Sequence, residues 1–116
     1  MAATLTAVEK GRQYEQLALD FLIAQGLQLV ECNYHSRRGE LDLVMYDQAV
    51  LVVVEVRYRK NNRYGSAVES ITPAKQQRIK ITTEQYIQQH HIKKAIRFDV
   101  VAIMGSQPPE WIKNAF

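Results

Sequence analysis

The sequence contains a single cysteine, Cys32, and no long apolar run. One cysteine cannot form an internal disulfide, and it excludes a zinc site built from several thiolates. A membrane-spanning helix needs about 20 consecutive apolar residues, a length that no segment of the chain approaches. The first residues also lack the basic start and apolar stretch of a secretion signal. We therefore expect a cytoplasmic protein without membrane contact, in which Cys32 is a small buried side chain.

Glycine and proline are scarce as well, with 5 and 3 residues among the 116. No linker, internal repeat or low-complexity segment divides the chain. A chain of this length supports one hydrophobic core, so we expect a single domain over residues 1–116, with its core at about 8–104 and a tail at 105–116. The net charge of +3 suits a polyanionic partner without demonstrating one.

Hydrophobic periodicity predicts helices over about 8–25 and 73–90 and strands over 27–34, 40–46, 50–58 and 95–104. The first helix is predicted from an apolar stripe formed by Tyr14, Leu17, Ala18, Phe21 and Leu22. The second begins with Thr72 as N-cap and Pro73 as first helical residue. The order α-β-β-β-α-β indicates an α/β fold, with a mixed sheet flanked by helices and one parallel strand pair made by a helical crossover.

Charged residues interrupt two of these apolar strands. Because side chains alternate along a strand, the second strand is predicted to place Glu40, Asp42 and Val44 on one face and Leu41, Leu43 and Met45 on the other. On the third strand, one face carries Val53, Glu55 and Arg57. A hairpin across residues 47–49 would therefore bring Asp42 near Glu55 and Arg57.

Two carboxylates held close together repel each other, which either raises one pKa or attracts a divalent cation. Oxygen ligands without cysteine or spaced histidines favour Mg²⁺ or Mn²⁺ over zinc. Asp42 and Glu55 suit such an ion, and solvated carboxylates on a surface strand are the alternative.

Asp42, followed after twelve residues by Glu55-Val56-Arg57, resembles the PD-(D/E)XK nuclease motif. The segments GRQYEQLALDFLIAQG, GELDLV, VVEVRYR, YGSAVESITPAKQQRI and RFDVVAI together resemble the YraN family of small bacterial proteins over roughly residues 11–104. The resemblance implies a restriction-endonuclease-like core, related to archaeal Holliday junction resolvases. It also implies a metal-dependent nuclease, in which Asp42 and Glu55 hold one or two Mg²⁺ or Mn²⁺ ions with the carbonyl of Val56.

Four further residues are candidates for roles around this site. Glu15 resembles a first-helix glutamate that adds a metal or water ligand, with a solvated helix residue as the alternative. Arg57 stands where the motif usually has lysine, and because a guanidinium stays charged, Arg57 can bind phosphate but cannot act as a general base. The base is then either a metal-bound water assisted by the substrate or another residue, for which Lys75 is the candidate. The alternatives are that Lys75 is a solvated helix lysine or that the substitution marks lost activity. Glu40 either hydrogen-bonds near Asp42 or is an ordinary strand-start carboxylate.

Basic residues in two predicted loops bracket this site, namely Arg37, Arg38, Arg59, Lys60 and Arg63. Such clusters bind backbone phosphates without reading sequence, and solubilising charge is the alternative. Tyr64 in the second loop is a candidate for stacking on an unpaired base. Asp99 is expected to pair internally with a basic residue, and His35, His90 and His91 are expected at the surface.

Three functions remain open at this point. The first is a metal-dependent endonuclease, acting on DNA rather than RNA and suited to branched or structured substrates. The second is a noncatalytic nucleic-acid-binding module that retains the nuclease fold. The third is a protein-interaction domain that uses the apolar tail. A homodimer would match the near-symmetry of a DNA junction, and the sequence leaves the oligomeric state open.

Overall fold

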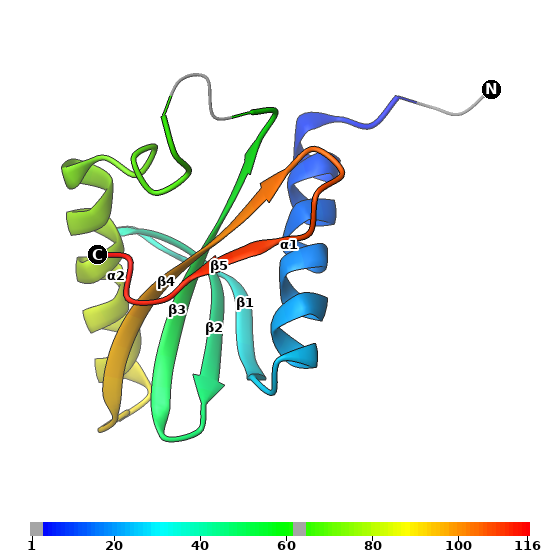
Figure 1. Ribbon diagram of the computed structural model, residues 1–116. Helices are drawn as coiled ribbons and strands as arrows, with labels where there is room; N and C mark the ends of the chain where they lie inside the picture. The colour runs from blue at the N-terminus through cyan, green and yellow to red at the C-terminus, as the bar shows by residue number, and fades with distance from the viewer. Residues whose placement is uncertain (1–3, 62–64) are drawn as a thin grey trace.

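The computed structural model describes residues 4–61 and 65–116, and these form two helices and a five-stranded sheet (Figure 1). The elements are α1 (Ala7–Ala24), β1 (Gln28–Ser36), β2 (Gly39–Asp47), β3 (Val50–Arg59), α2 (Pro73–Gln89), β4 (Ala95–Met104) and β5 (Glu110–Ile112). The α/β fold predicted from the sequence is confirmed, with β5 as an added strand. Within the described residues, neither helix is long and apolar enough to cross a membrane.

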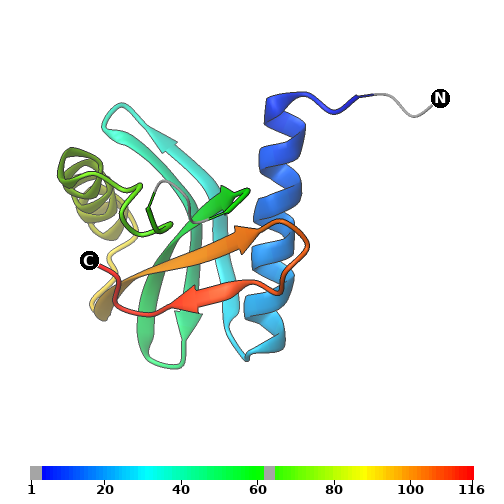
Figure 2. The same cartoon turned by 45° about the horizontal axis from the view of Figure 1, so that its top comes forward.

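The strands lie in the order β1-β2-β3-β4-β5. The pair β3–β4 is parallel, because α2 crosses over between these strands, and the other pairs are antiparallel. Helix α1 covers one face of the sheet and α2 the other, as Figures 1 and 2 both show. The sheet is thus the middle layer of three.

Each helix begins at a threonine cap, and the cap of α2 is the one predicted from the sequence. The Thr72 hydroxyl accepts a hydrogen bond from the Lys75 backbone N–H at 3.2 Å, and Pro73 opens α2. Thr6 caps α1 in the same way, by accepting from the Glu9 N–H at 3.1 Å. These caps satisfy backbone donors that would otherwise lack partners in the first turn.

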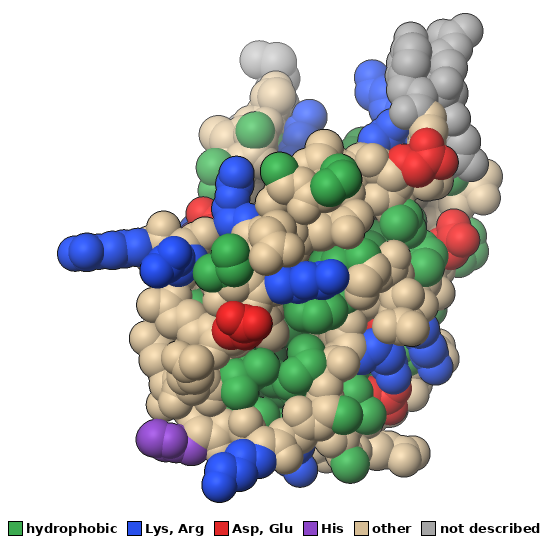
Figure 3. Space-filling view, turned by 90° about the vertical axis from the view of Figure 1, so that its left-hand side faces the viewer, with side chains coloured by type: hydrophobic (Ala, Val, Ile, Leu, Met, Phe, Trp, Pro, Cys, Tyr) green, Lys and Arg blue, Asp and Glu red, His purple; other side chains and the backbone are tan. Residues whose placement is uncertain are grey.

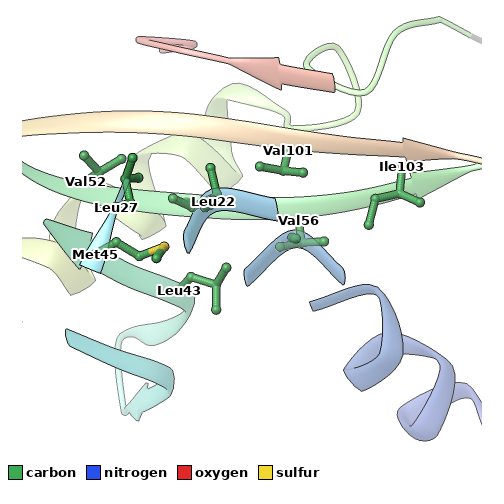
Figure 4. Packing of buried hydrophobic residues seen from close by; sticks show 10 residues of the cluster. Leu22, Leu27, Leu43, Met45, Val52, Val56, Val101 and Ile103 are labelled. Atoms are coloured by element: carbon green, nitrogen blue, oxygen red, sulfur yellow. The ribbon is translucent and has the colours of Figure 1, made fainter. Parts of the chain in front are cut away.

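The two faces of the sheet carry separate cores. Figure 4 shows the α1 side, where Leu22 lies over side chains from three strands. These include Leu43, Met45, Val52, Val56, Val101 and Ile103. On the other side, Ile79 and Tyr86 of α2 pack with Val44, Leu51, Val53 and Val100. The alternating valines of β3 therefore supply both cores.

One member of the predicted α1 stripe does not face the sheet. Ala18 and Leu22 are fully buried and Tyr14 and Phe21 pack at their margin, but Leu17 is 51% exposed. Each helical residue turns by about 100°, so Leu17 lies at the edge of the stripe whose centre is Ala18.

The predicted facing of β2 is wrong at one end. Leu43 packs on the α1 side with Met45, but Leu41, predicted to share their face, packs on the α2 side. The change of side falls where the backbone pairing of β2 with β3 ends, beyond Leu43 and Val54. There β2 pairs only with β1, on which Asn33 has a left-handed backbone with φ of 55°.

Cys32 is exposed, although the sequence predicted a buried side chain. The reason is its position on β1, which is the edge strand of the sheet. By contrast, His35, His90 and His91 are exposed as predicted.

The segment 105–116, predicted as a tail, contains a strand. β5 pairs antiparallel with β4, with Val100 opposite Ile112 and Ala102 opposite Glu110. Asp99 explains why so short a strand is held, because it accepts hydrogen bonds at 2.9 Å from the Trp111 indole and the Asn114 backbone N–H. Asp99 also pairs with Arg97 at 2.9 Å, which confirms the predicted internal partner.

Candidate active site

The candidate site lies where β2 and β3 separate. Their backbone pairing runs from Asp47 and Val50 to Leu43 and Val54, and it stops there. Beyond this point the β1–β2 hairpin leans toward α2, whereas the end of β3 extends in another direction (Figures 1 and 2). Asp42 and Glu55 are the next residues on the two strands. The separation therefore opens the sheet at the two carboxylates.

Asp42 connects β2 to β3 just beyond the point where their backbone pairing ends. Its Oδ2 accepts a hydrogen bond from the backbone N–H of Val56 at 2.9 Å. This contact fixes the carboxylate of β2 against β3, because a backbone donor cannot move away independently of its strand.

The guanidinium of Arg57 lies among the residues predicted to bind a metal. Its Nη1 is 4.0 Å from Asp42 Oδ2, and its Nη2 is 3.6 Å from Glu55 Oε2. Nη1 also donates to the carbonyl oxygen of Val56 at 3.1 Å. The hairpin thus brings Asp42, Glu55, Val56 and Arg57 together, as the sequence indicated, and the arginine supplies the positive charge at their centre.

Glu55 is buried, but hydrogen bonds do not satisfy its whole carboxyl group. Its exposed fraction is 4%, and within the described part of the chain its Oε1 has no hydrogen-bond partner. Burial, followed by the negative charge of Asp42, raises the pKa of Glu55 to about 9, although Arg57 and Lys75 act in the opposite direction. At neutral pH the carboxyl of Glu55 therefore keeps its proton.

This donor set fits a divalent cation that takes few protein ligands. The unpartnered oxygen of Glu55, the Asp42 carboxylate and the Val56 carbonyl are all oxygen donors, and Mg²⁺ is typically held by one or two carboxylates plus water and phosphate. Among residues 4–61 and 65–116, no group of three or more His, Cys, Asp or Glu side chains is arranged to hold a metal ion. These residues therefore do not form a metal site in which protein side chains supply every ligand.

Glu15 lies near the site without completing such a cluster. Its pKa is raised, first by burial and then by the charge of Asp42, while a hydrogen bond from Asn33 and the charge of Arg12 lower it. Glu15 therefore adds negative charge on the α1 side. Glu40 is mostly exposed and pairs with His35 at 3.2 Å, so it belongs to the rim.

A cavity of about 320 Å³ lies over the carboxylates on the α2 side. It is lined by Gly39, Glu40, Asp42, Glu55, Arg57, Lys75, Arg78 and Ile79. Lys75 thus faces the carboxylates, as the sequence suggested. Figure 3 shows this side of the molecule, where Lys and Arg side chains are prominent on the surface that α2 forms.

Arg78 and Gly39 are site residues that the sequence reasoning missed. Arg78 follows Lys75 by three positions, so it lies on the same side of α2, and that spacing could have identified it. Gly39 allows α2 to come close, because an added Cβ would lie 2.8 Å from Thr82 Oγ1 and 3.2 Å from Arg78 Cγ. No pattern in the sequence predicts this close approach of α2 to Gly39.

The predicted basic residues flank the open end of the sheet. Arg37 and Arg38 form the β1–β2 turn, whereas Arg59 ends β3 and Lys60 follows it. Because β2 and β3 are antiparallel, the start of β2 and the end of β3 lie at the same end of the sheet as the carboxylates. Arg63 and Tyr64 lie outside the described residues.

Comparison with known sequences places these residues in a family. Residues 14–103 match the uncharacterised protein family UPF0102. A UPF0102 protein of Legionella pneumophila is 49% identical over 93% of this chain and 94% of its own length. UPF0102 proteins of Aeromonas hydrophila and Nitrosococcus oceani are 47% and 46% identical, over 96% and 93% of this chain and 87% and 91% of their own. The chain therefore belongs to UPF0102, which is the YraN family that its motifs resemble.

Proposed function

We propose that the protein is a metal-dependent nuclease that hydrolyses phosphodiester bonds in DNA, with branched or structured DNA as the preferred class. The observation that carries the proposal is the buried carboxyl of Glu55, whose Oε1 lacks a partner among the described residues, beside a second carboxylate in an open cavity. A buried polar atom without a partner costs free energy, so its retention points to a group bound in the working state.

Asp42 and Glu55 are the proposed ligands of Mg²⁺ or Mn²⁺, together with the carbonyl oxygen of Val56. When bound, such an ion activates a water for attack on phosphorus and neutralises charge on the leaving oxygen. Asp42 is held in place by the Val56 N–H, and Glu55 must release its proton to become a ligand. Ion binding is therefore coupled to proton release and strengthens as pH rises toward 9.

Arg57 has a double role in this proposal. In the free protein its guanidinium lies beside the carboxyl groups of Asp42 and Glu55 and donates a hydrogen bond to the Val56 carbonyl. With an ion held by these groups, Arg57 would be free to bind the scissile phosphate and to stabilise the negative charge that develops on it. Because it cannot lose a proton, Arg57 does not act as the base.

Lys75 is the proposed proton acceptor or phosphate contact on the α2 side. Its ammonium is close enough to Glu55 to lower the pKa of that carboxyl, and it lines the same cavity. Arg37, Arg38, Arg59, Lys60 and Arg63 are proposed to bind flanking phosphates, which would give affinity without sequence selectivity.

The proposal is tested by calorimetry with MnCl₂ and by cleavage of linear, single-stranded and four-way DNA in Mg²⁺ or EDTA. Wild-type protein is expected to bind Mn²⁺ and to cut DNA only with the metal present. Asp42→Asn and Glu55→Gln should lose both properties, whereas Glu84→Gln, at an exposed position of α2, should keep both. Metal binding that survives both site substitutions would disprove the assignment.

The contact of Arg57 with Asp42, Glu55 and the Val56 carbonyl also supports a second candidate, a noncatalytic DNA-binding module in which the arginine replaces the metal permanently. That protein would bind four-way DNA equally well in Mg²⁺ and EDTA and would not cleave it. Absence of binding to every DNA tested would instead favour a protein-interaction domain.

A further inference from the structure

A second cavity, of about 470 Å³, lies beside α1. Glu40 lines both this cavity and the one over Asp42 and Glu55, so the two adjoin at the open end of the sheet. The walls of the second cavity come from the first turns of α1, including Gly11 and Glu15, and from Asn33 on β1. The fold thus extends the candidate active site past the edge of the sheet.

Gly11 is not explained by the packing of the fold. It lies inside α1, where glycine is about 1 kcal/mol less favourable than alanine. A Cβ built at Gly11 meets no atom of the described residues within 4 Å, and its φ is not positive. Gly11 precedes Glu15 by one helical turn on the same side of α1. The missing side chain therefore leaves open space in front of Glu15.

Asn33 shapes the opposite wall. It lies between the paired positions Cys32–Leu43 and Tyr34–Leu41, which places it beside Asp42 of the neighbouring strand. Its left-handed backbone is unusual inside a strand, and such residues concentrate at functional sites. The side chain of Asn33 also hydrogen-bonds Glu15, which lines the same cavity. A strained strand residue and an unexplained helical glycine therefore border one space.

The polar groups of this cavity favour a nucleoside over a phosphate. Glu15 and Glu40 bring negative charge, which repels a phosphate, and Arg12 is the cation among the lining residues. The Asn33 amide and the carboxyl groups suit the donor and acceptor edges of a base. Val8, which is 65% exposed, gives the cavity an apolar side chain beside the open space at Gly11, against which a base or sugar can pack.

We propose that this cavity binds the sugar and base of the nucleotide next to the scissile phosphate, and that Gly11 keeps the cavity open. The proposal rests on the nuclease function proposed above. It assigns a role to Gly11 and Asn33 that differs from metal binding, since neither supplies a metal ligand.

The test compares Gly11→Met with Gly11→Ala and with Gln13→Met, which adds the same side chain about 200° away on an exposed face of α1. Each variant is titrated by fluorescence anisotropy with a single-stranded oligonucleotide and with an abasic strand of equal length. Wild type should prefer the strand with bases. Gly11→Met should bind that strand about tenfold more weakly and bind the abasic strand unchanged. Gln13→Met should stay within about twofold of wild type on both strands.

Urea unfolding separates function from folding. Both Gly11 variants should unfold at a higher urea concentration than wild type, because alanine and methionine favour the helix. Gly11→Ala, whose short side chain fills less of the cavity, should show a smaller loss of binding than Gly11→Met.

Three outcomes would overturn the proposal or part of it. Equal binding by Gly11→Met and wild type, or an equal loss on both strands, would remove the nucleoside subsite alone. If wild type binds DNA but does not cleave it with Mg²⁺, the nuclease function is removed. The comparison of the strand with bases and the abasic strand then still decides whether the cavity binds a nucleoside. No binding of wild type to either strand would remove both.

Discussion

Asp99 and Glu55 are both buried carboxylates, and each has an arginine two positions away on the same strand, but their surroundings differ. Asp99 is fully buried, and its Oδ1 accepts from Arg97 Nε and the Asn114 N–H, both at 2.9 Å. Its Oδ2 accepts from Arg97 Nη2 and the Trp111 indole, also at 2.9 Å. Glu55 Oε1 has no hydrogen-bond partner among the described residues. Arg57 Nη2 lies 3.6 Å from Glu55 Oε2 but makes no hydrogen bond there.

This difference in hydrogen bonding identifies Asp99 as a structural acidic residue and Glu55 as a candidate functional one. Around Asp99 every oxygen is used, and the result is a fixed connection between β4 and the segment that contains β5. Around Glu55 the fold leaves a donor and an acceptor unused in an open cavity. The pairs Arg97–Asp99 and Glu55–Arg57 look alike in the sequence. They differ in whether their polar atoms are all hydrogen-bonded, and this difference indicates their different roles.

The largest effect is expected from removing the structural carboxylate. Asp99→Ala would leave Arg97 charged and poorly paired and would free the Trp111 and Asn114 donors, so we expect a loss of about 3–5 kcal/mol in the free energy of unfolding. Urea unfolding measures it. Asp47→Ala is the control, because Asp47 accepts a single 2.9 Å bond from Arg97 at the edge of the same network, and it should cost clearly less. If Asp99→Ala and Asp47→Ala lose the same free energy of unfolding, Asp99 is not the centre of this hydrogen-bond network.

Glu55→Gln should have the opposite sign. The raised pKa of about 9 means that the folded protein keeps a proton that the unfolded chain releases above about pH 4.5, so wild type loses stability as pH rises between these values. Glutamine mimics the protonated carboxyl at every pH. We expect Glu55→Gln to be more stable than wild type by roughly 1–3 kcal/mol at pH 8 and equally stable at pH 4.

Urea unfolding at several pH values in EDTA tests this prediction, with Glu84→Gln as the exposed control. A stability difference between Glu55→Gln and wild type that does not change with pH would contradict the assigned ionisation.

A smaller effect is expected at Arg57. Replacing Arg57 with Gln removes the positive charge that competes with an ion for Asp42, Glu55 and the Val56 carbonyl, so Mg²⁺ binding should tighten about tenfold. The loss of Arg57 also raises the pKa of Glu55, so the tightening should be clearest at alkaline pH. Calorimetry with Arg38→Gln as control measures it, and weaker ion binding by Arg57→Gln would exclude competition.

The smallest effect is expected from Trp111→Phe. This change removes one donor to Asp99 but keeps an aromatic ring near Phe21, whose centroid lies 6.4 Å from that of Trp111. Arg97 still satisfies the same carboxylate oxygen, so the expected cost is about 1 kcal/mol. A double-mutant cycle with Asp99→Ala should show that the two effects are not additive.

The sequence predicted the helices, four strands and the meeting of Asp42, Glu55 and Arg57, because each depends on local periodicity and on one hairpin register. It did not predict what depends on distant contacts. β5 forms because Asp99 captures Trp111 and Asn114, a pairing across the sequence that no local pattern shows. The exposure of Cys32 follows from the edge position of β1. Similarly, Gly39 and Arg78 enter the site through the packing of α2 against β2.

The left-handed backbone of Asn33 also affects how molecules of this protein meet one another. β1 is an edge strand, and a regular edge offers a row of free donors and acceptors onto which a strand of another chain can add. The irregular register between Leu29 and Glu31, together with the left-handed backbone at Asn33, interrupts that row. An interrupted edge is a poorer template for edge-to-edge aggregation than a regular one.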